Sequence, residues 1–195
     1  IGRINRQGVY EVIPENERAY STSTIYSNDH GKTWRQGGQT GLGHNATESR
    51  IVELANGDIM VNARMNTSPA RWVAISTDRG RTWTARTDSV AISTPVDCGL
   101  IRVSGKGKRK ENCLMFSHPK ELHKREGMTV SLSYDNGKTW PVNKLVYPYG
   151  SSYSDLVQLP DGTFGLIYEK TYKSGEHTSS GVAFARFNYS WLTEK

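Results

Sequence analysis

The sequence predicts an all-β domain built as a β-propeller, of which residues 1–195 form an incomplete arc of about three to four blades. The first observation is an eight-residue pattern, Ser-x-Asp-x-Gly-x-Thr-Trp, which occurs at Ser27–Trp34, Ser76–Trp83 and Ser133–Trp140. Repeats at intervals of roughly fifty residues are typical of solenoids, propellers or arrays. The second observation is that the intervening segments are strand-like, and no window has a long helical period.

Each repeat predicts the tip of a β-hairpin. The carboxylate of an Asp two residues before a Gly can accept hydrogen bonds from the backbone amides of a tight turn, and the Gly supplies a positive φ. The Thr-Trp pair that follows suits the start of the next strand. The three tryptophans could pack between neighbouring elements or serve as stacking platforms for a sugar. Their identical turn contexts favour packing, with each indole buried.

The segments between the repeats predict the remaining strands. Four of them are rich in β-branched and aromatic residues: "RWVAIST" at 71–77, "GLIRV" at 99–103, "MTVSLS" at 128–133 and "GVAFARF" at 181–187. Asn56-Gly57 and Asp161-Gly162 lie between apolar runs, as hairpin turns do. One four-stranded, antiparallel blade per interval accounts for this pattern.

Composition excludes some classes of function. The net charge is +6, and the densest basic run is "KGKRKE" at Lys106–Glu111. Neither a basic helix nor interleaved aromatic residues accompany this run, so a solvated loop is favoured over a nucleic-acid site. An anionic small substrate remains compatible with the charge. No apolar run has the length of a membrane span.

The two cysteines, Cys98 and Cys113, are too few for a disulfide framework. They could face each other across a hairpin, but two buried thiols are favoured. Their spacing and that of the histidines give no metal-ligand pattern, so neither a metal nor a cofactor is expected. The chain begins at Ile1 rather than at Met, and we expect it to be the later part of a longer domain whose N-terminal blades precede it.

The three repeats resemble the Asp-box, or bacterial neuraminidase repeat (BNR), of the sialidase superfamily. That family has a six-bladed β-propeller fold, and its Asp-boxes lie at the blade periphery, away from the catalytic centre. The resemblance therefore implies a structural role for the repeats. Asp-boxes also occur in propellers that only bind partners, so the motif by itself does not imply catalysis.

The segments between the repeats resemble the catalytic segments of sialidases. "ATESRIVELANGDIMVNARM" at Ala46–Met65 is similar to the stretch that holds a catalytic glutamate and the second arginine of a carboxylate-binding triad, which match Glu48 and Arg64. "REGMTVSLSYDNGKTW" at Arg125–Trp140 is similar to the stretch that begins with the third arginine, matching Arg125.

Two later segments extend this resemblance. "SYSDLVQLPDGTFGLIYEK" at Ser152–Lys170 is similar to the segment that contains the nucleophilic tyrosine and a glutamate that steadies an arginine, which match Tyr153 and Glu169. "FNYSWL" at Phe187–Leu192 resembles the last strand of a sialidase domain. The resemblance thus covers nearly the whole chain.

The chemistry of these residue types suits a sialic acid, whose anomeric carbon bears a carboxylate. Guanidinium groups bind a planar anion through paired hydrogen bonds. Alternation along "DIMVNAR" places Arg64 at a strand end, on the face opposite Ile59, Val61 and Ala63. Without the resemblance, Arg64 and Arg125 would be ordinary surface arginines.

The nucleophile follows from the same negative charge. A carboxylate would be repelled by the substrate carboxylate, and sialidases are the exception among glycosidases that use a neutral tyrosine. A phenol with a free pKa near 10 needs a base, and the resemblance gives that role to Glu48 beside Tyr153. From the residues alone, a packing tyrosine at a strand edge is favoured for Tyr153, and Glu48 could be a polar residue that enters a strand.

Two groups of the sialidase pattern have no match in this chain: the first triad arginine in an Arg-Ile-Pro motif, and the acid/base aspartate. Asp97 in "PVDCGL" does not have the context of that aspartate. The resemblance implies a retaining exo-α-sialidase that acts on sialylated glycoproteins, glycolipids or oligosaccharides in a secreted, periplasmic or lysosomal setting. The alternatives are a non-catalytic Asp-box propeller and a trans-sialidase. Residues 1–195 alone are expected to be inactive.

Overall fold

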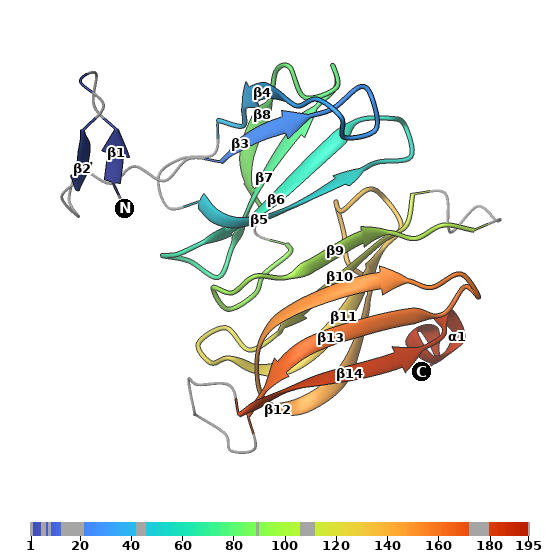
Figure 1. Ribbon diagram of the computed structural model, residues 1–195. Coiled ribbons are helices and arrows are strands. Elements are labelled where there is room, and N and C mark those ends of the chain that lie inside the picture. The colour runs from blue at the N-terminus through green and yellow to red at the C-terminus, as the bar shows by residue number, and fades with distance from the viewer. Residues whose placement is uncertain are drawn as a thin grey trace.

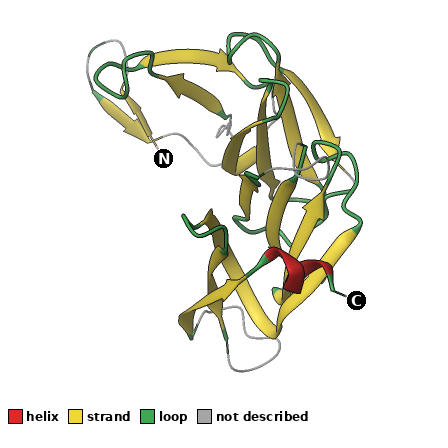
Figure 2. Ribbon diagram, turned by 90° about the vertical axis from the view of Figure 1, so that its right-hand side faces the viewer, coloured by secondary structure: helices red, strands yellow, loops and turns green. Residues whose placement is uncertain are grey.

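The computed structural model describes residues 2–4, 7, 9–12, 22–41, 46–88, 90–105, 112–171 and 180–194. The basic run Lys106–Glu111 lies outside the described residues. The described chain is almost entirely β-structure, in sheets that curve into an arc (Figures 1 and 2). The prediction of an all-β, incomplete propeller is confirmed.

The first half of the chain forms three separate sheets. Two are antiparallel pairs, β1 (Gly2–Ile4) with β2 (Tyr10–Val12), and β3 (Ser23–Tyr26) with β4 (Arg35–Gln39). The third is a four-stranded antiparallel blade of β5 (Ala46–Glu53), β6 (Ile59–Met65), β7 (Arg71–Ser76) and β8 (Thr84–Asp88).

The second half forms one antiparallel sheet of six strands. They are β9 (Gly99–Arg102), β10 (Leu114–Pro119), β11 (Glu126–Ser133), β12 (Val142–Gln158), β13 (Phe164–Lys170) and β14 (Gly181–Phe187). This differs from the expected series of separate four-stranded blades. The reason is β12, whose 17 residues pair with β11 up to Gly150 and with β13 from Ser151 onward. One continuous strand therefore ends one blade and begins the next.

The three Asp-boxes lie at the tips of the β3–β4, β7–β8 and β11–β12 hairpins, as the repeats predict. In each box the Asp carboxylate accepts the amide of the Thr four residues later, at 2.8, 2.9 and 2.9 Å for Asp29, Asp78 and Asp135. The Ser hydroxyl accepts the amide of the Gly, at 2.8, 2.7 and 2.8 Å. These contacts are internal to each turn, which indicates a structural role.

The tryptophans do not share one environment, so the expectation that each is buried is wrong for the first box. Trp83 and Trp140 are half-buried against apolar clusters, and the Trp140 ring lies 5.5 Å from that of Phe116. Trp34 is 60% exposed. It belongs to the two-stranded β3–β4 sheet, which offers less apolar surface to cover an indole.

The core lies between successive blades. Leu54, Met60 and Val73 of the β5–β8 blade pack against Val96, Leu100 and Phe116 around the β9–β10 pair. A second cluster joins β10 and β11 to the β12–β14 hairpins. Cys98 and Cys113 are both buried free thiols, as the favoured alternative predicted. Blade-on-blade packing explains why both faces of β6 are largely buried.

The segment "FNYSWL" is not a last strand. Strand β14 ends at Phe187, and the short helix α1 (Tyr189–Thr193) follows. Asn188 is its N-cap, since the side-chain oxygen accepts the amide of Trp191 at 2.8 Å. This local capping bond favours helix over a further strand. Among the described residues, no helix has both the length and the apolar character needed to cross a membrane.

Candidate active site

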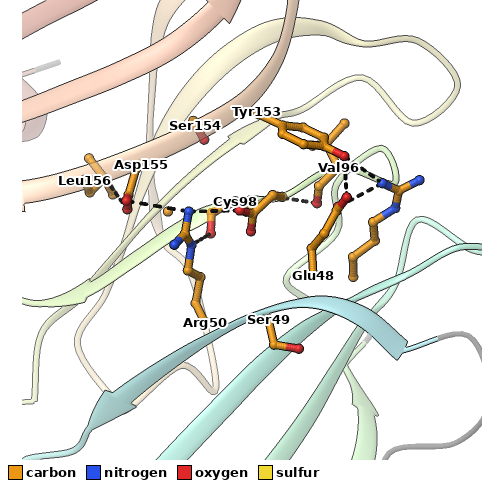
Figure 3. A network of polar contacts seen from close by, with 12 residues as sticks. Glu48, Ser49, Arg50, Val96, Cys98, Tyr153, Ser154, Asp155 and Leu156 are labelled. Atoms are coloured by element: carbon orange, nitrogen blue, oxygen red, sulfur yellow. Dashed lines mark hydrogen bonds and ion pairs between the residues drawn. The ribbon is translucent and has the colours of Figure 1, made fainter. Parts of the chain in front are cut away.

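The predicted residues Glu48 and Tyr153 meet, although they are 105 positions apart. The Tyr153 hydroxyl donates a hydrogen bond to Oε1 of Glu48 (Figure 3). Arg64 approaches both, since its Nη1 donates to Glu48 Oε2 at 2.8 Å and to the Tyr153 hydroxyl at 3.4 Å. The Arg64 and Glu48 side chains retain 18% and 30% of their exposure, and Tyr153 retains 37%, so the cluster is open to solvent.

Each blade begins with a strand, and these first strands bring the residues together. They are β5, β9 and the second half of β12. Glu48 is on β5, and Tyr153 is on the second half of β12. Strand β9 lies against both β5 and β12, and it is preceded by the segment that contains Asp97. Tyr153 and Glu48 therefore project into one space from the two blades on either side of the blade that begins with β9, and Figure 3 shows this space from close by.

Both residues lie within irregularities of strand pairing. The β5–β6 register shifts between Ala46 and Ser49, and the β12–β13 register shifts between Ser151 and Ser154. A bulge inserts an extra residue on one strand and redirects a side chain that regular alternation would fix. Glu48 and Tyr153 are thus placed where the backbone departs from regular alternation.

Arg125 and Glu169 lie beside Tyr153. Arg125 donates to Ser152 Oγ at 3.3 Å and to the Pro95 carbonyl at 3.5 Å, both long contacts. Glu169 was expected to steady an arginine, but the described residues contain no ion pair between Glu169 and an arginine. Instead, its Oε2 accepts the backbone amide of Tyr153 at 3.3 Å. The structure therefore places Glu169 at the peptide of Tyr153.

The electrostatic surroundings hold the proton on the phenol. The pKa of Tyr153 is raised above its ordinary value, first because its hydroxyl donates to the Glu48 carboxylate, and then through burial and the negative charge of Glu48. The cations Arg64 and Arg125 oppose this rise. A group that draws the negative charge of Glu48 away would therefore favour the phenolate.

A cavity of about 260 Å³ opens beside Tyr153 and Glu169. Arg50, Asp97 and Asp155 also line this cavity. None of the three Asp-box tryptophans lines this cavity, in agreement with their structural role. No group of three or more His, Cys, Asp or Glu side chains suited to a metal ion occurs in the part of the chain that the structure describes.

Sequence reasoning missed Arg50, which lies beside the Glu48–Tyr153 pair and donates to Asp97 at 2.9 Å. Burial raises the pKa of Asp97, and the Arg50 guanidinium opposes that rise. The sequence context of Asp97 does not match that of the sialidase acid/base aspartate, and the structure pairs Asp97 with the Arg50 cation. The sequence signal that could have found Arg50 is spacing. Arg50 lies two residues after Glu48, and Asp155 lies two residues after Tyr153, so each is expected on the same strand face as the proposed catalytic residue.

The chain resembles known proteins along most of its length. The BNR repeat-like domain family matches residues 8–166. The chain belongs to this family. A sialidase of Micromonospora viridifaciens is 36% identical over 179 residues, which cover 89% of this chain and 26% of that protein. The relationship to sialidases that the Asp-boxes predict is confirmed.

Two solved structures extend the comparison of this BNR repeat-like domain to the fold. The Hadza microbial sialidase Hz136 superposes with a TM-score of 0.74 at 29% identity, over 87% of this chain and 32% of that chain. The intramolecular trans-sialidase from Ruminococcus gnavus superposes with a TM-score of 0.71 at 27% identity, over 88% and 38%. The chain spans well under half the length of each relative, and it has the fold of the corresponding part of a sialidase propeller.

Proposed function

We propose that this chain is the later part of the catalytic domain of an exo-α-sialidase, a retaining glycoside hydrolase that removes terminal sialic acid from glycoproteins, glycolipids or oligosaccharides. The observation that carries the proposal is the hydrogen bond from the Tyr153 hydroxyl to the Glu48 carboxylate, beside Arg64. A phenol paired with a carboxylate base and flanked by guanidinium groups suits attack on an anionic sugar.

Arg64 and Arg125 are proposed to bind the substrate carboxylate. Both flank Tyr153 and lower the cost of negative charge there. Among the described residues, Arg125 makes only long contacts, so its donors are available to a better acceptor. The Nε of Arg64 is buried and has no hydrogen-bond partner in the described part of the chain, which is unfavourable for a charged group until an acceptor arrives or the side chain shifts.

The reaction then proceeds at Tyr153. Its oxygen forms a bond to the anomeric carbon, the bond from that carbon to the leaving oxygen breaks, and the phenolic proton passes to Glu48. The leaving oxygen takes a proton from the acid/base group, for which no residue of this chain has been matched. Water then attacks the same carbon and gives a proton to that acid/base group, while the bond from the carbon to the Tyr153 oxygen breaks. Glu48 returns its proton to the Tyr153 oxygen, and the two displacements together retain the configuration.

The experiment is hydrolysis of sialyllactose by the full-length protein and by its Tyr153→Phe variant. We expect kcat to fall by about 10²-fold or more, with little change in substrate binding, because Phe keeps the ring and loses the nucleophile. Tyr149→Phe is the matched control, since Tyr149 is an exposed tyrosine on the same strand. Near-normal turnover by Tyr153→Phe would remove Tyr153 from this role.

A trans-sialidase is the second candidate, and the structural similarity to the Ruminococcus gnavus enzyme favours including it. The two reactions share the tyrosine intermediate and differ in the acceptor that releases it. Product analysis separates them, because hydrolysis gives free sialic acid whereas transfer gives a new glycoside or an intramolecular product. The third candidate is a non-catalytic Asp-box propeller. In that case the wild type and Tyr153→Phe would bind sialyllactose with equal affinity, and neither protein would cleave it.

A further inference from the structure

Arg50 connects the strands that hold Glu48 and Tyr153. It lies on β5, and its Nη2 is 2.9 Å from Asp97 Oδ2 and 3.6 Å from Asp155 Oδ2. Its Nε also donates to the carbonyl of Cys98 at 3.3 Å. Figure 3 shows Arg50 and Glu48 projecting from β5 toward the same space.

Strands β5 and β12 belong to different sheets, and no described backbone pairing joins them. Side chains join them instead, at two points. One is the contact between Glu48 and Tyr153, and the other is the ion pair of Arg50 with Asp155, two residues further along each strand. The second connection limits how far β5 and β12 can move apart at the first.

The segment Pro95–Cys98 strengthens this second connection, because its four successive carbonyls all accept hydrogen bonds. Three donors are guanidinium groups, Arg125 to Pro95, Arg71 to Val96 and Arg50 to Cys98, at 3.5, 2.9 and 3.3 Å. The fourth is the amide of Ser154, which donates to Asp97 at 3.4 Å. Arg71 is 1% exposed, so this segment is fixed from within the core.

We infer that Arg50 is a positioning residue, which holds β5 against the Pro95–Cys98 segment and β12 so that Glu48 stays within hydrogen-bond reach of Tyr153. This inference rests on the proposed function for its kinetic consequence. Without the Arg50 cation, Asp97 and Asp155 lose their counter-ion beside the Glu48 carboxylate, and the three like charges favour separation of the strands. Arg50 itself does not touch the phenol.

The kinetic test uses the full-length protein with Arg50→Met, Arg50→Lys and the control Arg186→Met. Arg186 forms an exposed ion pair with Asp161 far along β14. We expect Arg50→Met to lower kcat by about 10- to 100-fold with KM changed less than about threefold, since small misplacement of reacting groups has costs of this size. The kcat of Arg50→Lys should fall less, because lysine keeps the positive charge and loses only the planar guanidinium. The kcat of Arg186→Met should equal that of the wild type.

A second measurement is independent of catalysis. Tyrosine labelled with ¹³C at Cζ reports the ionisation of each phenol by NMR, and the Tyr153 signal is the one missing from Tyr153→Phe. The wild-type pKa of Tyr153 is expected above its ordinary value, because of the bond to Glu48. In Arg50→Met the pKa of Tyr153 should fall toward that of a free phenol, because Glu48 is no longer held within hydrogen-bond reach. The charged groups that face or line the site around Tyr153 are Glu48, Arg50, Arg64, Asp97, Arg125, Asp155 and Glu169.

The two measurements separate the two proposals. If the wild type leaves sialosides uncleaved, the proposed function fails, and the Tyr153 titration still decides the positioning role. A kcat of Arg50→Met within about twofold of wild type, an effect confined to KM, or an unchanged Tyr153 titration would each overturn the inference. If Arg50→Met does not fold, the same comparisons on Arg50→Lys decide the outcome.

Discussion

At the scale of single residues, Arg64 contacts both the proposed base and the proposed nucleophile of the candidate site. One of its nitrogens donates both to Glu48 and to the Tyr153 hydroxyl. The cation thus keeps the Glu48 carboxylate close to the phenol, and it is also proposed to bind the substrate carboxylate. A change at Arg64 should therefore disturb the base, the nucleophile and the substrate together.

Arg64→Lys is expected to weaken both substrate binding and turnover in the full-length protein. An ammonium group lacks the planar fork that bonds two partners at once, and hydrogen bonds to charged groups contribute about 1.5–3 kcal/mol, or roughly 10- to 100-fold in kcat/KM. Steady-state kinetics on an aryl sialoside measure the loss. Arg86→Lys, on the exposed face of β8, is the matched control. Equal kcat/KM values for Arg64→Lys and wild type would contradict the assigned role.

Sequence could indicate Glu48, Arg64, Arg125 and Tyr153 only through resemblance, since each residue type is common on protein surfaces. The structure adds the contact of Tyr153 with Glu48 and the position of Glu169 at the peptide of Tyr153. The ion pair between Arg50 and Asp97 could not be predicted from resemblance. Their contact spans 47 positions and depends on how successive blades pack, which no local pattern encodes.

At the scale of elements, the Asp-box hairpin tips depend on ionised carboxylates. The pKa values of Asp29 and Asp78 are lowered to about 2 by hydrogen bonds from Thr33 and Thr82 respectively, with smaller contributions from Ser27 and Ser76. Both the side chain and the amide of each Thr donate to the carboxylate. Each box is thus a turn held by charge-assisted bonds within itself.

Stability should accordingly fall at acid pH. The pKa of Asp78 is depressed in the folded state, so its contribution is present above the unfolded value near 3.9 and is lost as the pH falls toward 2. Denaturant unfolding of the full-length protein between pH 6 and pH 2 measures this. Between pH 4 and pH 2, Asp78→Asn should lose less stability than wild type. Parallel pH curves for the two proteins would show that the turn carboxylate contributes nothing.

Element types followed from the sequence more reliably than element boundaries. The Asn-Gly and Asp-Gly turns and the Asp-box tips lie where turn chemistry placed them. The continuity of β12 across two blades was not predictable, because Gly150 gives a local signal for a break while pairing on both sides keeps the strand extended. The exposure of Trp34 depends on its blade neighbours rather than on its turn.

At the scale of the whole molecule, the arc has an apolar face at its end. Strand β14 is the edge of its sheet, and exposed apolar residues gather on it and on the next two strands of the sheet, β13 and β12. They are Val157, Ile167, Val182 and Phe184, at 47%, 49%, 65% and 61% exposure. In a closed propeller each blade packs on two others, and an uncovered face of this kind favours association.

Residues 1–195 expressed alone should therefore self-associate, and they should release negligible sialic acid from sialyllactose. The chain lacks a match to the acid/base aspartate, and general acid catalysis alone contributes about 10²–10⁴ in rate. Light scattering after size exclusion measures association, and Phe184→Lys should reduce it while Val90→Lys, exposed on another part of the arc, should not. A monomeric chain with robust activity on sialyllactose would contradict this account.

The propeller architecture was predictable because three turns repeat with the same chemistry, and each repeat implies one blade. The positions where the blades join were not predictable. A repeat fixes the hairpin tips, but the packing of adjacent sheets depends on side chains that are far apart in the sequence. Val96, Cys98 and Leu100 contribute to the packing between the β5–β8 blade and the next, and only tertiary structure relates them to Met60 and Val73.

The central claim is that Tyr153 attacks the anomeric carbon, and the most direct measurement is to trap that bond. A sialosyl fluoride with a second fluorine beside the anomeric carbon slows both displacements, while its good leaving group keeps the first one feasible. The full-length protein is incubated with it, digested and examined by mass spectrometry. We predict one added sialosyl group on the peptide that contains Tyr153, absent from Tyr153→Phe and retained in Tyr149→Phe. A sialosyl group on Glu48 or another carboxylate, or turnover without any adduct at Tyr153, would contradict the claim.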